Sequence, residues 1–414
     1  MAQIFPFQPY RYTRKAGALD QLVTQPYDKI SADMRERYLA QSPYNLVRII
    51  LGKPEEGDNE SNNVYTRAAA YLDEWIAAGI LAREAEPSLY AYFQEFSDPD
   101  TGERLVRKGF IGLGQVEDYD ARIVHRHEQT LSGPKKDRLQ VLRHTRAHFG
   151  QIFMLYPDPE AAIDRLLDEA AVSEPLGAVT DEYGAVHRLW RIPAPAVIAE
   201  IQRLMSGKKL VIADGHHRYE TALTFRNESG MEDARRVMMT FVNMHSPGLR
   251  ILATHRLVKN LEGFDPGKLV NGLRALGAVT PMSAAQARQR LAREERGSIL
   301  LGVAMAGEDH VHVLARPRGA GELDVAFLHR EVLEAILGIG EEAVREEKYL
   351  SYVRGIDAAL GEVAERKVQA AFLLQPTKIE EVAEISFGMG VMPQKSTDFY
   401  PKLLSGMTIY RLER

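Results

Sequence analysis

The sequence predicts an α+β protein that has a mixed-sheet core and an inserted smaller α+β unit. About eight to ten strand-like segments are interleaved with helical segments along the chain, which indicates a protein of both element types. The chain has 414 residues, more than one compact core usually holds. We expect a core over 1–260 that carries an anion-binding turn, an inserted subdomain over 261–321, and a segment over 322–414 that returns to the core.

The composition is that of an ordinary globular protein, with 45% hydrophobic and 26% charged residues. A net charge of −5 gives no general positive field, so we expect no nucleic-acid or membrane partner. The absence of cysteine excludes disulfides, thiol nucleophiles and cysteine metal sites. No signal-peptide pattern opens the chain, and no run approaches roughly 18 apolar residues, so a cytoplasmic protein is expected. The sequence leaves the oligomeric state open.

Periodicity and turn residues predict most elements before the central strand. Ser31 can cap a helix, and Pro43-Tyr44-Asn45 then ends it. Asp98-Pro99-Asp100-Thr101-Gly102 predicts a hairpin between two strands. The predicted helices cover 32–40, 64–76, a stretch opening near 133, 160–171 and 193–205, and the predicted strands cover 46–51, 88–96, 103–116, 151–156 and, with a turn, 178–192.

The pattern changes after the central helix, where 261–321 is expected to form the inserted unit. Residues 349–361 give a mixed pattern. The predicted strands here cover 237–243, 249–258, 298–305, 310–315 and 370–374, and the predicted helices cover 268–276, 284–293, 327–337 and 379–385. Element boundaries read from such patterns shift by a few residues.

The strongest functional signal is the run Asp214-Gly215-His216-His217-Arg218, which lies between a buried strand over 208–213 and a predicted helix. Glycine lets the backbone turn sharply and approach a ligand. The helix N-terminus offers free N–H groups and a positive dipole end, and Arg218 can grip an anion bidentately. Asp214 is an acceptor for a metal ion or a hydroxyl. The structural alternative is a turn with an N-cap and surface histidines. Three donor side chains behind a buried strand favour the anion site.

Four other polar clusters are candidates for the same site. His125 and His127 are spaced to share one face of an extended chain, as a metal pair would be. The alternative there is a polar loop, and the helical two-histidine spacing of zinc enzymes is absent. The other three clusters have structural alternatives too. Residues 135–138 could be a solvated helical turn, 254–256 a half-exposed strand, and 395–402 a surface turn. The candidate phosphate- or substrate-binding residues in these clusters are His127, Glu128, Lys136, Arg138, His255, Arg256, Lys395, Ser396, Thr397 and Lys402.

Several common nucleotide and hydrolase motifs are missing. The sequence has no Walker-type Gly-x-x-x-x-Gly-Lys-Ser/Thr run and no Gly-x-Gly-x-x-Gly fingerprint. It also has no Gly-x-Ser-x-Gly elbow. Ordinary P-loop, Rossmann and serine-hydrolase interpretations are therefore disfavoured.

The chain resembles, over nearly its whole length, the bacterial and archaeal family catalogued as domain of unknown function 1015. That family brings no settled biochemical activity with it. The resemblance rests on motifs that occur in order: Pro26-Tyr27-Asp28, Pro43-Tyr44-Asn45, His127-Glu128 with Lys136-Asp137-Arg138, Asp214-Gly215-His216-His217-Arg218, Thr254-His255-Arg256, and Met392-Pro393 with Lys395-Ser396-Thr397 and Phe399-Tyr400-Pro401-Lys402.

A second, local resemblance links Asp214, Gly215, His216 and Arg218 to the phosphate-binding turn of the ParB and sulfiredoxin superfamily. Free-serine kinases of that superfamily carry an Asp-Gly-His-x-Arg motif of this form. The sulfiredoxin reaction needs a cysteine, which this chain lacks, and a partition protein fits poorly with an acidic chain that has no DNA-binding helix pair. The resemblance therefore implies a ParB/sulfiredoxin-like core and a kinase, with no position matched for the kinase's catalytic glutamate.

These observations lead us to expect a phosphotransferase that moves phosphate from a nucleotide to a small hydroxy metabolite, with serine as one candidate. Asp214 or Asp28 would orient the acceptor hydroxyl or Mg²⁺. The backbone after Asp214, with His216, His217 and Arg218, would hold the phosphate, and Lys135, Lys136, Arg138, Lys395 and Lys402 would add positive charge. Two alternatives stay open: a phosphatase acting on phosphoserine or another phosphate ester, and a sensor that binds a nucleotide or phosphorylated metabolite without turnover. A metal-dependent hydrolase built on His125, His127 and either His216 or His217 is the least favoured.

Overall fold

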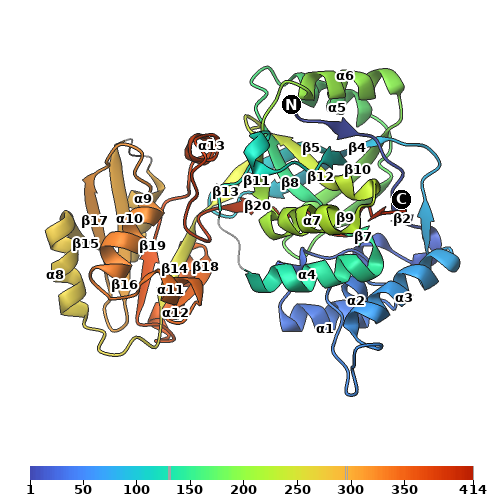
Figure 1. Ribbon diagram of the computed structural model, residues 1–414. Coiled ribbons are helices and arrows are strands. Elements are labelled where there is room, and N and C mark those ends of the chain that lie inside the picture. The colour runs from blue at the N-terminus through green and yellow to red at the C-terminus, as the bar shows by residue number, and fades with distance from the viewer. Residues whose placement is uncertain (129–131, 294, 296, 414) are drawn as a thin grey trace. The chain divides into compact units, whose positions relative to one another are not determined.

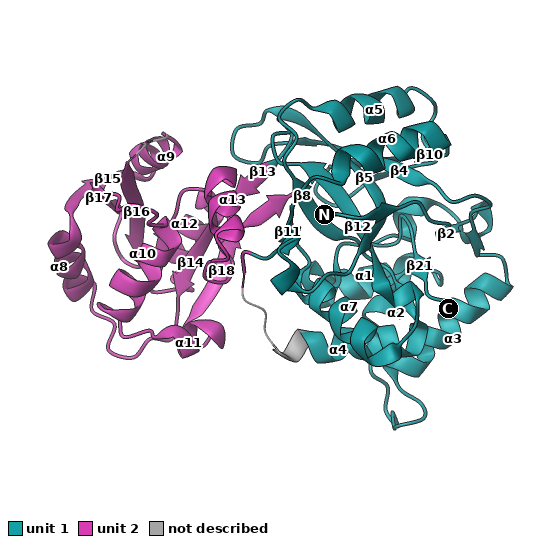
Figure 2. Cartoon of the chain, turned by 45° about the horizontal axis from the view of Figure 1, so that its top comes forward, with its two compact units in different colours: residues 1–126, 130–249, 401–414 teal, residues 127–129, 250–400 magenta. Residues whose placement is uncertain are grey.

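The computed structural model describes residues 1–128, 132–293, 295 and 297–413 (Figure 1). The chain divides into two compact units (Figure 2). Unit 1 comprises Met1–Arg126, Thr130–Leu249 and Pro401–Arg414, and unit 2 comprises His127–Gln129 and Arg250–Tyr400. Unit 2 is thus larger than the insertion expected over 261–321, and the returning segment that belongs to unit 1 is shorter than 322–414.

Unit 1 is built around a nine-stranded mixed sheet. The strands run in the order β6-β11-β8-β12-β5-β4-β10-β9, and β1 pairs with β5. Two pairs, β6 with β11 and β8 with β12, are parallel, and the other pairs of this sheet are antiparallel. The strands are β1 (Ile4–Phe5), β4 (Leu89–Ser97), β5 (Arg104–Gln115), β6 (Val124–His125), β8 (Ile152–Tyr156), β9 (Gly177–Thr180), β10 (Val186–Ile192), β11 (Leu210–Asp214) and β12 (Arg236–Asn243).

Helices cover both sides of this sheet, with α5 and α6 on one side and α7, α4 and α3 on the other (Figure 1). The helices of unit 1 are α1 (Ala32–Gln41), α2 (Val47–Ile50), α3 (Val64–Ala77), α4 (Ser132–Thr145), α5 (Ala162–Ala170), α6 (Pro195–Met205) and α7 (His216–Ser229). Two short strand pairs complete the unit: β2 (Tyr10–Tyr12) with β3 (Leu81–Arg83), and β7 (Ala147–His148) with β21 (Tyr410–Arg411). Because β21 belongs to the returning segment, that segment is tied into unit 1.

One predicted strand, over 46–51, is wrong, because this stretch forms the short helix α2. The Asn45 side chain accepts a hydrogen bond from the backbone N–H of Val47, as a residue that opens a helical turn does. Leu46, Val47, Ile49 and Ile50 are all buried. A short apolar run that is buried all round gives no period with which to separate helix from strand.

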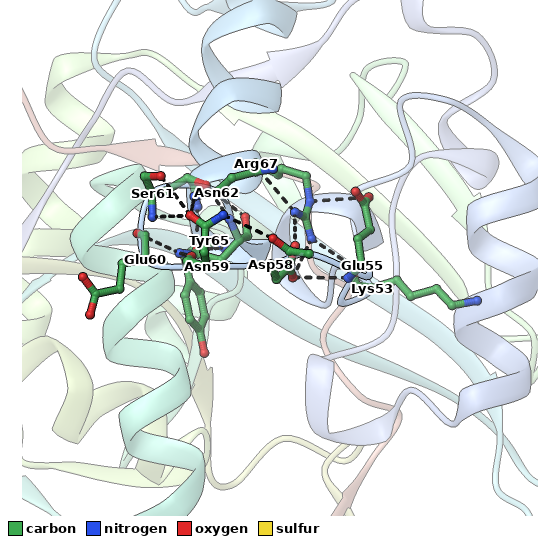
Figure 3. Close-up of polar contacts among 12 residues, drawn as sticks. Lys53, Glu55, Asp58, Asn59, Glu60, Ser61, Asn62, Tyr65 and Arg67 are labelled. Atoms are coloured by element: carbon green, nitrogen blue, oxygen red, sulfur yellow. Dashed lines mark hydrogen bonds and ion pairs between the residues drawn. The ribbon is translucent and has the colours of Figure 1, made fainter.

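The acidic loop before α3 is ordered by its own polar contacts (Figure 3). Arg67 binds Asp58 through two nitrogens, at 2.6 and 3.0 Å. The Asn63 side chain accepts from the backbone N–H groups of Tyr65 and Thr66 and so caps α3. The loop therefore fixes the first turn of α3, which carries the Tyr65 ring toward the residues described below.

Unit 2 is built around a six-stranded sheet whose pairs are all antiparallel, in the order β15-β17-β16-β19-β14-β18. The strands of this sheet are β14 (Thr254–Val258), β15 (Ala278–Met282), β16 (Ser298–Met305), β17 (Val311–Pro317), β18 (Leu350–Arg354) and β19 (Ala370–Leu373). Two further strands of unit 2, β13 (Arg250–Leu252) and β20 (Asp398–Tyr400), form a separate pair. Its helices are α8 (Pro266–Leu276), α9 (Ala284–Ala292), α10 (Asp324–Phe327) with the π-helix Leu328–Glu334, α11 (Glu341–Arg345), α12 (Ile356–Ala364) and α13 (Ile379–Phe387).

The boundaries expected for the insertion fail because they divide this sheet. Only β15, β16 and β17 lie within 261–321, whereas β14, β18 and β19 complete the same sheet from outside that range. The strand expected over 249–258 is also two strands, since β13 pairs with β20 and β14 pairs with β18 and β19. None of the helices in the described parts of the chain has the length and apolar character needed to cross a membrane.

Candidate functional site

The junction between β11 and α7 turns the chain from strand to helix within two residues. Pairing of β11 with β8 places Asp214 opposite Phe153 and leaves Ala213 as an extra residue, which is a β-bulge. Because paired residues share a face, the bulge brings the Asp214 side chain to the face that carries Phe153. Gly215 follows with a φ of 92° and precedes the first turn of α7. This left-handed conformation strains other residues, which accounts for the glycine.

Two cationic side chains bind the Asp214 carboxylate. Arg218 Nη2 lies 2.6 Å from Oδ2, and Lys402 Nζ lies 3.1 Å from Oδ1. The three side chains are exposed by 21% for Asp214, 15% for Arg218 and 8% for Lys402, so water screens these contacts poorly. Burial alone would raise the pKa of Asp214, but Lys402, Arg218 and Lys29 outweigh burial and hold that pKa well below its usual value. Asp214 is therefore an ionised group at neutral pH.

Arg218 is fixed by groups on two sides of its guanidinium. Nη2 donates to Asp214, and Nη1 donates to the backbone carbonyl of Gln151. The guanidinium also lies against Gly215, where an added Cβ would meet its central carbon at 3.0 Å. Gly215 thus supplies the left-handed turn and the space that Arg218 occupies.

A pocket within unit 1 opens beside Arg218. Its empty volume is about 600 Å³, part of which is open to solvent. Arg138 and Arg218 line it with positive charge, and Tyr27, Thr221 and Ser405 line it with hydroxyls. The apolar lining comes from residues such as Ile50, Val141, Leu142, Phe149, Ile152 and Val237. Cations and hydroxyls on one apolar concavity suit a small ligand that carries a phosphate or carboxylate.

A chain of contacts orients Arg138 at this pocket. The Tyr65 hydroxyl donates to Asp137 Oδ1 at 2.9 Å, and Arg138 Nε donates to Asp137 Oδ2 at 2.9 Å. Arg138 Nη1 donates to the carbonyl of Ile50 at 2.6 Å. The guanidinium carbon lies 4.1 Å from the centre of the Tyr27 ring, in a cation–π contact. The ordered first turn of α3 therefore reaches the pocket through Asp137.

Two further titratable groups line the pocket, and both are neutral near pH 7. Burial, with Asp28 as the next contribution, raises the pKa of Tyr27 to about 12. Burial lowers the pKa of His148 to about 4. The His148 ring is stacked on Tyr410 of the returning segment, with centroids 6.1 Å apart. Tyr27 is thus a hydroxyl donor and His148 is an unprotonated imidazole, while the positive charge comes from the arginines.

The other candidates of unit 1 occupy different surroundings. His216 is buried, His217 is half-buried, and Lys136 and Asp28 are exposed. Asp28 nevertheless lies next to the pocket-lining Tyr27 in the 3-10 turn Tyr27–Lys29. Lys135, which we expected to add charge to a phosphate pocket, is paired with Glu220 of α7. The catalytic role expected for Asp28 stays a prediction.

Seven of the predicted residues gather in unit 2 as a cluster of their own. They are His127, Glu128, His255, Arg256, Lys395, Ser396 and Thr397. His127 Nε2 lies 2.8 Å from Thr397 Oγ1, and the backbone N–H of Lys395 donates to Glu128 at 3.2 Å. Arg256 donates to the carbonyls of Gln394 and Lys395, both at 3.1 Å. These contacts join His127 to Thr397 and connect Glu128 and Arg256 to the backbone of Lys395, and the binding role expected for the cluster stays a prediction.

Burial governs the electrostatics of that cluster. It lowers the pKa of Arg256 to about 10 and, together with the Arg256 charge, lowers the pKa of His255 to about 4. His255 Nδ1 accepts a hydrogen bond from the backbone N–H of Leu374 at 3.2 Å. His255 is therefore neutral, and Arg256 organises the backbone of the segment before β20.

Comparison with known proteins places the chain in a family. It belongs to the family described as Protein of unknown function (DUF1015), whose model matches residues 4–331. No curated protein matches the chain at a significant level. The sequence resemblance to this family is confirmed.

Solved structures give weaker likenesses. A free serine kinase in complex with AMP is 13% identical, with a TM-score of 0.38 over 70% of this chain and 88% of that chain. A conserved hypothetical protein from Pyrococcus furiosus is 13% identical, with a TM-score of 0.37 over 70% and 92% of the two chains. SbnI with a C-terminal truncation, from Staphylococcus aureus, is 10% identical, with a TM-score of 0.36 over 71% and 85%. Scores this low assign no activity to this chain.

Sequence reasoning missed three groups of this site. Tyr27 stood in a quoted motif but was not assigned a role, and its place next to the candidate Asp28 was the available signal. His148 sits at a strand of two residues, where no period exists to mark it. The Gln151 side chain is fully buried, and neither its amide nitrogen nor its oxygen has a hydrogen-bond partner among the described residues. Nothing in the sequence around Gln151 indicates that environment.

Proposed function

We propose that unit 1 binds the phosphate of a nucleotide in the pocket beside Arg218 and transfers a phosphoryl group from that nucleotide to the hydroxyl of a small metabolite, with serine as one candidate. The observation that carries the proposal is the position of Arg218, which lines the pocket while Asp214 and Gln151 hold it in place. A guanidinium fixed in this way keeps edges available for a phosphate and loses little freedom on binding. We also propose that the core of unit 1 belongs to the ParB/sulfiredoxin-like superfamily, which the Asp214, Gly215, His216 and Arg218 motif supports.

The surroundings of Arg218 support an anionic ligand. The pocket meets the first turns of α7, a helix of 14 residues whose N-terminal dipole favours negative charge. Arg138 adds a second cation, oriented by Asp137. Phosphoryl transfer depends mainly on positioning and charge neutralisation, and the pocket offers groups for both.

Asp214 takes a different role in this proposal from the one its position in the motif first implied. Both carboxylate oxygens are bound to cations, so Asp214 does not fit as a ligand for Mg²⁺. Its lowered pKa also makes it a weak proton acceptor. In the proposal Asp214 positions Arg218 and Lys402, and Asp28, which is exposed beside Tyr27, takes the role of orienting an acceptor hydroxyl or a nucleotide-bound Mg²⁺.

A non-catalytic sensor is the second candidate, and one observation favours it. His148 lines the pocket, but its pKa of about 4 makes it a poor general base at neutral pH. A phosphatase acting on a phosphate ester would use the same cations. The three functions share the binding step and differ in turnover.

Binding is tested first, with ATP, ADP, AMP, serine and phosphoserine added singly to the full chain in thermal-shift and calorimetric titrations. We expect a phosphate-bearing ligand to raise the melting temperature. Arg218→Ala should weaken its binding at least about tenfold, as loss of a charged hydrogen bond does. Arg226→Ala is the matched control, since Arg226 lies on the same helix and binds Asp118. Equal affinity of the wild type and Arg218→Ala would refute the proposal.

Turnover is tested next by ³¹P NMR with ATP and serine, and separately with phosphoserine alone. Appearance of a phosphomonoester with ADP identifies a kinase. Release of inorganic phosphate from phosphoserine identifies a phosphatase. Saturable binding without either product identifies the sensor and removes the transfer step from the proposal.

A further inference from the structure

The turn between β16 and β17 of unit 2 brings two histidines and a glutamate together, far along the chain from every residue of the proposed phosphate site. Glu308 lies in the turn, His310 precedes β17, and His312 is the second residue of that strand. Alternate residues of an extended chain share one face, so both imidazoles project to the same side as the turn. One nitrogen from each histidine and one oxygen of Glu308 lie within 4.8 Å of one another.

The three atoms form a triangle of the size that a tetrahedral metal ion requires. His312 Nε2 lies 2.8 Å from Glu308 Oε2 and 3.1 Å from His310 Nε2. His310 Nε2 lies 3.5 Å from the same carboxylate oxygen. Zinc bonds of about 2.0–2.2 Å to nitrogen and oxygen at tetrahedral angles place neighbouring ligand atoms roughly 3.3–3.5 Å apart. The separation of 3.5 Å lies at that value, and those of 3.1 and 2.8 Å lie below it, so binding would move the two histidines and the carboxylate slightly apart.

The hydrogen-bonding chemistry of the triangle also favours a cation. A proton on one of the two nitrogens can form a hydrogen bond along only one edge of the triangle. A metal ion over the centre of the triangle can accept a lone pair from all three atoms. His310 Nδ1 lies 3.2 Å from Asp309 Oδ1. A proton on Nδ1 donated to that carboxylate leaves the lone pair of Nε2 for a metal, which is the carboxylate–histidine–metal arrangement of many sites. His312, by contrast, makes its polar contacts through Nε2 alone, because its Nδ1 has no partner among the described residues.

We propose that Glu308, His310 and His312 bind one divalent transition-metal ion of the zinc class. Two imidazoles and a carboxylate are the ligands that such ions select. The ligands are exposed by 9% for His312, 27% for Glu308 and 34% for His310, so the site is held on one side and open to solvent on the other. The open side leaves a coordination position for water or a small anionic ligand. Its class is thus a three-ligand site, distinct from the closed four-ligand structural type.

This site uses none of the residues of the metal-binding hypothesis that the sequence raised. That hypothesis joined His125 and His127 to a histidine of the Asp-Gly-His-His run, but His127 Nε2 contacts Thr397, and His125 Nε2 contacts the carbonyl of Arg122. The inference is also independent of the proposed phosphate chemistry, because it uses no residue of unit 1.

The test uses the tag-free full chain, stripped of metal and titrated with Zn²⁺ by calorimetry, with Co²⁺ as a spectroscopic substitute. We expect one equivalent of either ion to bind and bound Co²⁺ to show visible bands of a four-coordinate complex. Each of Glu308→Gln, His310→Gln and His312→Gln should weaken binding more than about tenfold, and Asp309→Asn should weaken it about tenfold through the orientation of His310. Circular dichroism confirms that the variants are folded, and His310, the most exposed of the three ligands at 34%, is the least disruptive position to change.

His144→Gln is the control for loss of a histidine elsewhere, since His144 is exposed on α4 and bonds to the carbonyl of Gln140. It should bind Zn²⁺ as the wild type does. Absence of stoichiometric binding by the wild type would overturn the proposal. So would binding that Glu308→Gln and His312→Gln leave unchanged, because the metal would then sit on other residues.

Discussion

The junction before α7 and the turn before β17 both contain a glycine in the left-handed conformation, but the proposed ligand is an anion at the first and a cation at the second. Gly215 and Gly307 both have a φ of 92°. Beside Gly215, one carboxylate is bound by the cations of Arg218 and Lys402, and beside Gly307, one carboxylate faces two imidazoles. A guanidinium also fills the space next to Gly215, whereas nothing lies within 4 Å of a Cβ added to Gly307. The turn conformation therefore does not decide what a site binds. The side chains placed around it do.

The largest effect should come from removing the Asp214 carboxylate at the junction before α7. Asp214→Ala leaves Arg218 and Lys402 without the carboxylate between them, and we expect the free energy of unfolding to fall by about 3–5 kcal/mol. Asp118→Ala removes a carboxylate from the exposed pair with Arg226, and should cost less than about 1 kcal/mol. Urea denaturation measures both variants. A loss below 1 kcal/mol for Asp214→Ala would show that the two cations tolerate the absence of the carboxylate. The pair at Asp214 would then contribute no more to stability than the exposed pair at Asp118.

A second, smaller effect should appear in the pH dependence of unit 1. Burial lowers the pKa of His148 to about 4 in the folded state, below the ordinary value of about 6.5. The unfolded chain then binds more protons between these values, so stability is complete above about pH 6.5 and declines as the pH falls toward 4. Because the ring is partly open to solvent, we expect this group to contribute about 1–2 kcal/mol of that decline.

The measurement compares wild type with His148→Gln, since His255 and His329 also have lowered pKa values and contribute equally to both proteins. The difference in unfolding free energy between the two proteins should shrink as the pH falls from about 6.5 to 4. A difference that stays constant across this interval would mean that His148 has the same pKa in the folded and unfolded chains.

The smallest expected difference, and the sharpest comparison, is that between the stability losses of Gly215→Ala and Gly307→Ala. Both changes force alanine into the same left-handed conformation, at a cost of about 1–2 kcal/mol. Only Gly215→Ala also meets a guanidinium at 3.0 Å, so it should lose roughly 1 kcal/mol more and should displace Arg218 from the pocket. Thermal denaturation and phosphate-ester titration measure the two variants side by side. Equal losses of stability with unchanged binding would show that Arg218 does not depend on this glycine.

Sequence reasoning succeeded where the chain carries a local signal. The alternation of 88–96 and 103–116 around a turn predicted the hairpin of β4 and β5, and Ser31 does cap α1. The strand, glycine and helix at 210–229 were also predicted, because the switch from a buried run to a helical pattern lies in adjacent residues. The coarse class, mixed α and β with a large mixed sheet, followed from the same signals.

Features that depend on long-range packing were out of reach. Val47–Ile50 forms a helix that the sequence did not reveal, because burial of the apolar residues around it removes the period that would mark a helix. The extent of unit 2 depends on pairing of β14 with β18 and β19, which are roughly 90–120 residues further along the chain. The pairing of Asp214 with Lys402 spans 188 residues, and the motif showed only that each residue was available for a site. The Glu308, His310 and His312 triangle lies at a hairpin turn, a local feature, but its spacing matches no familiar metal motif.

The division of unit 1 along the chain has a consequence for the order in which the protein is made. Lys402 binds Asp214 and Ser405 lines the pocket, yet both emerge from the ribosome only after residues 250–400 have been synthesised. At 5–20 residues per second, that stretch of roughly 150 residues takes on the order of 10–30 s. A nascent chain can thus hold the large sheet, Arg218 and Asp214 while it still lacks the lysine that completes the ion pairs. Arg250 and Tyr400 are partners in β13 and β20, so the chain leaves and re-enters unit 1 at neighbouring points. Translation itself therefore delays the pocket until unit 2 has been made.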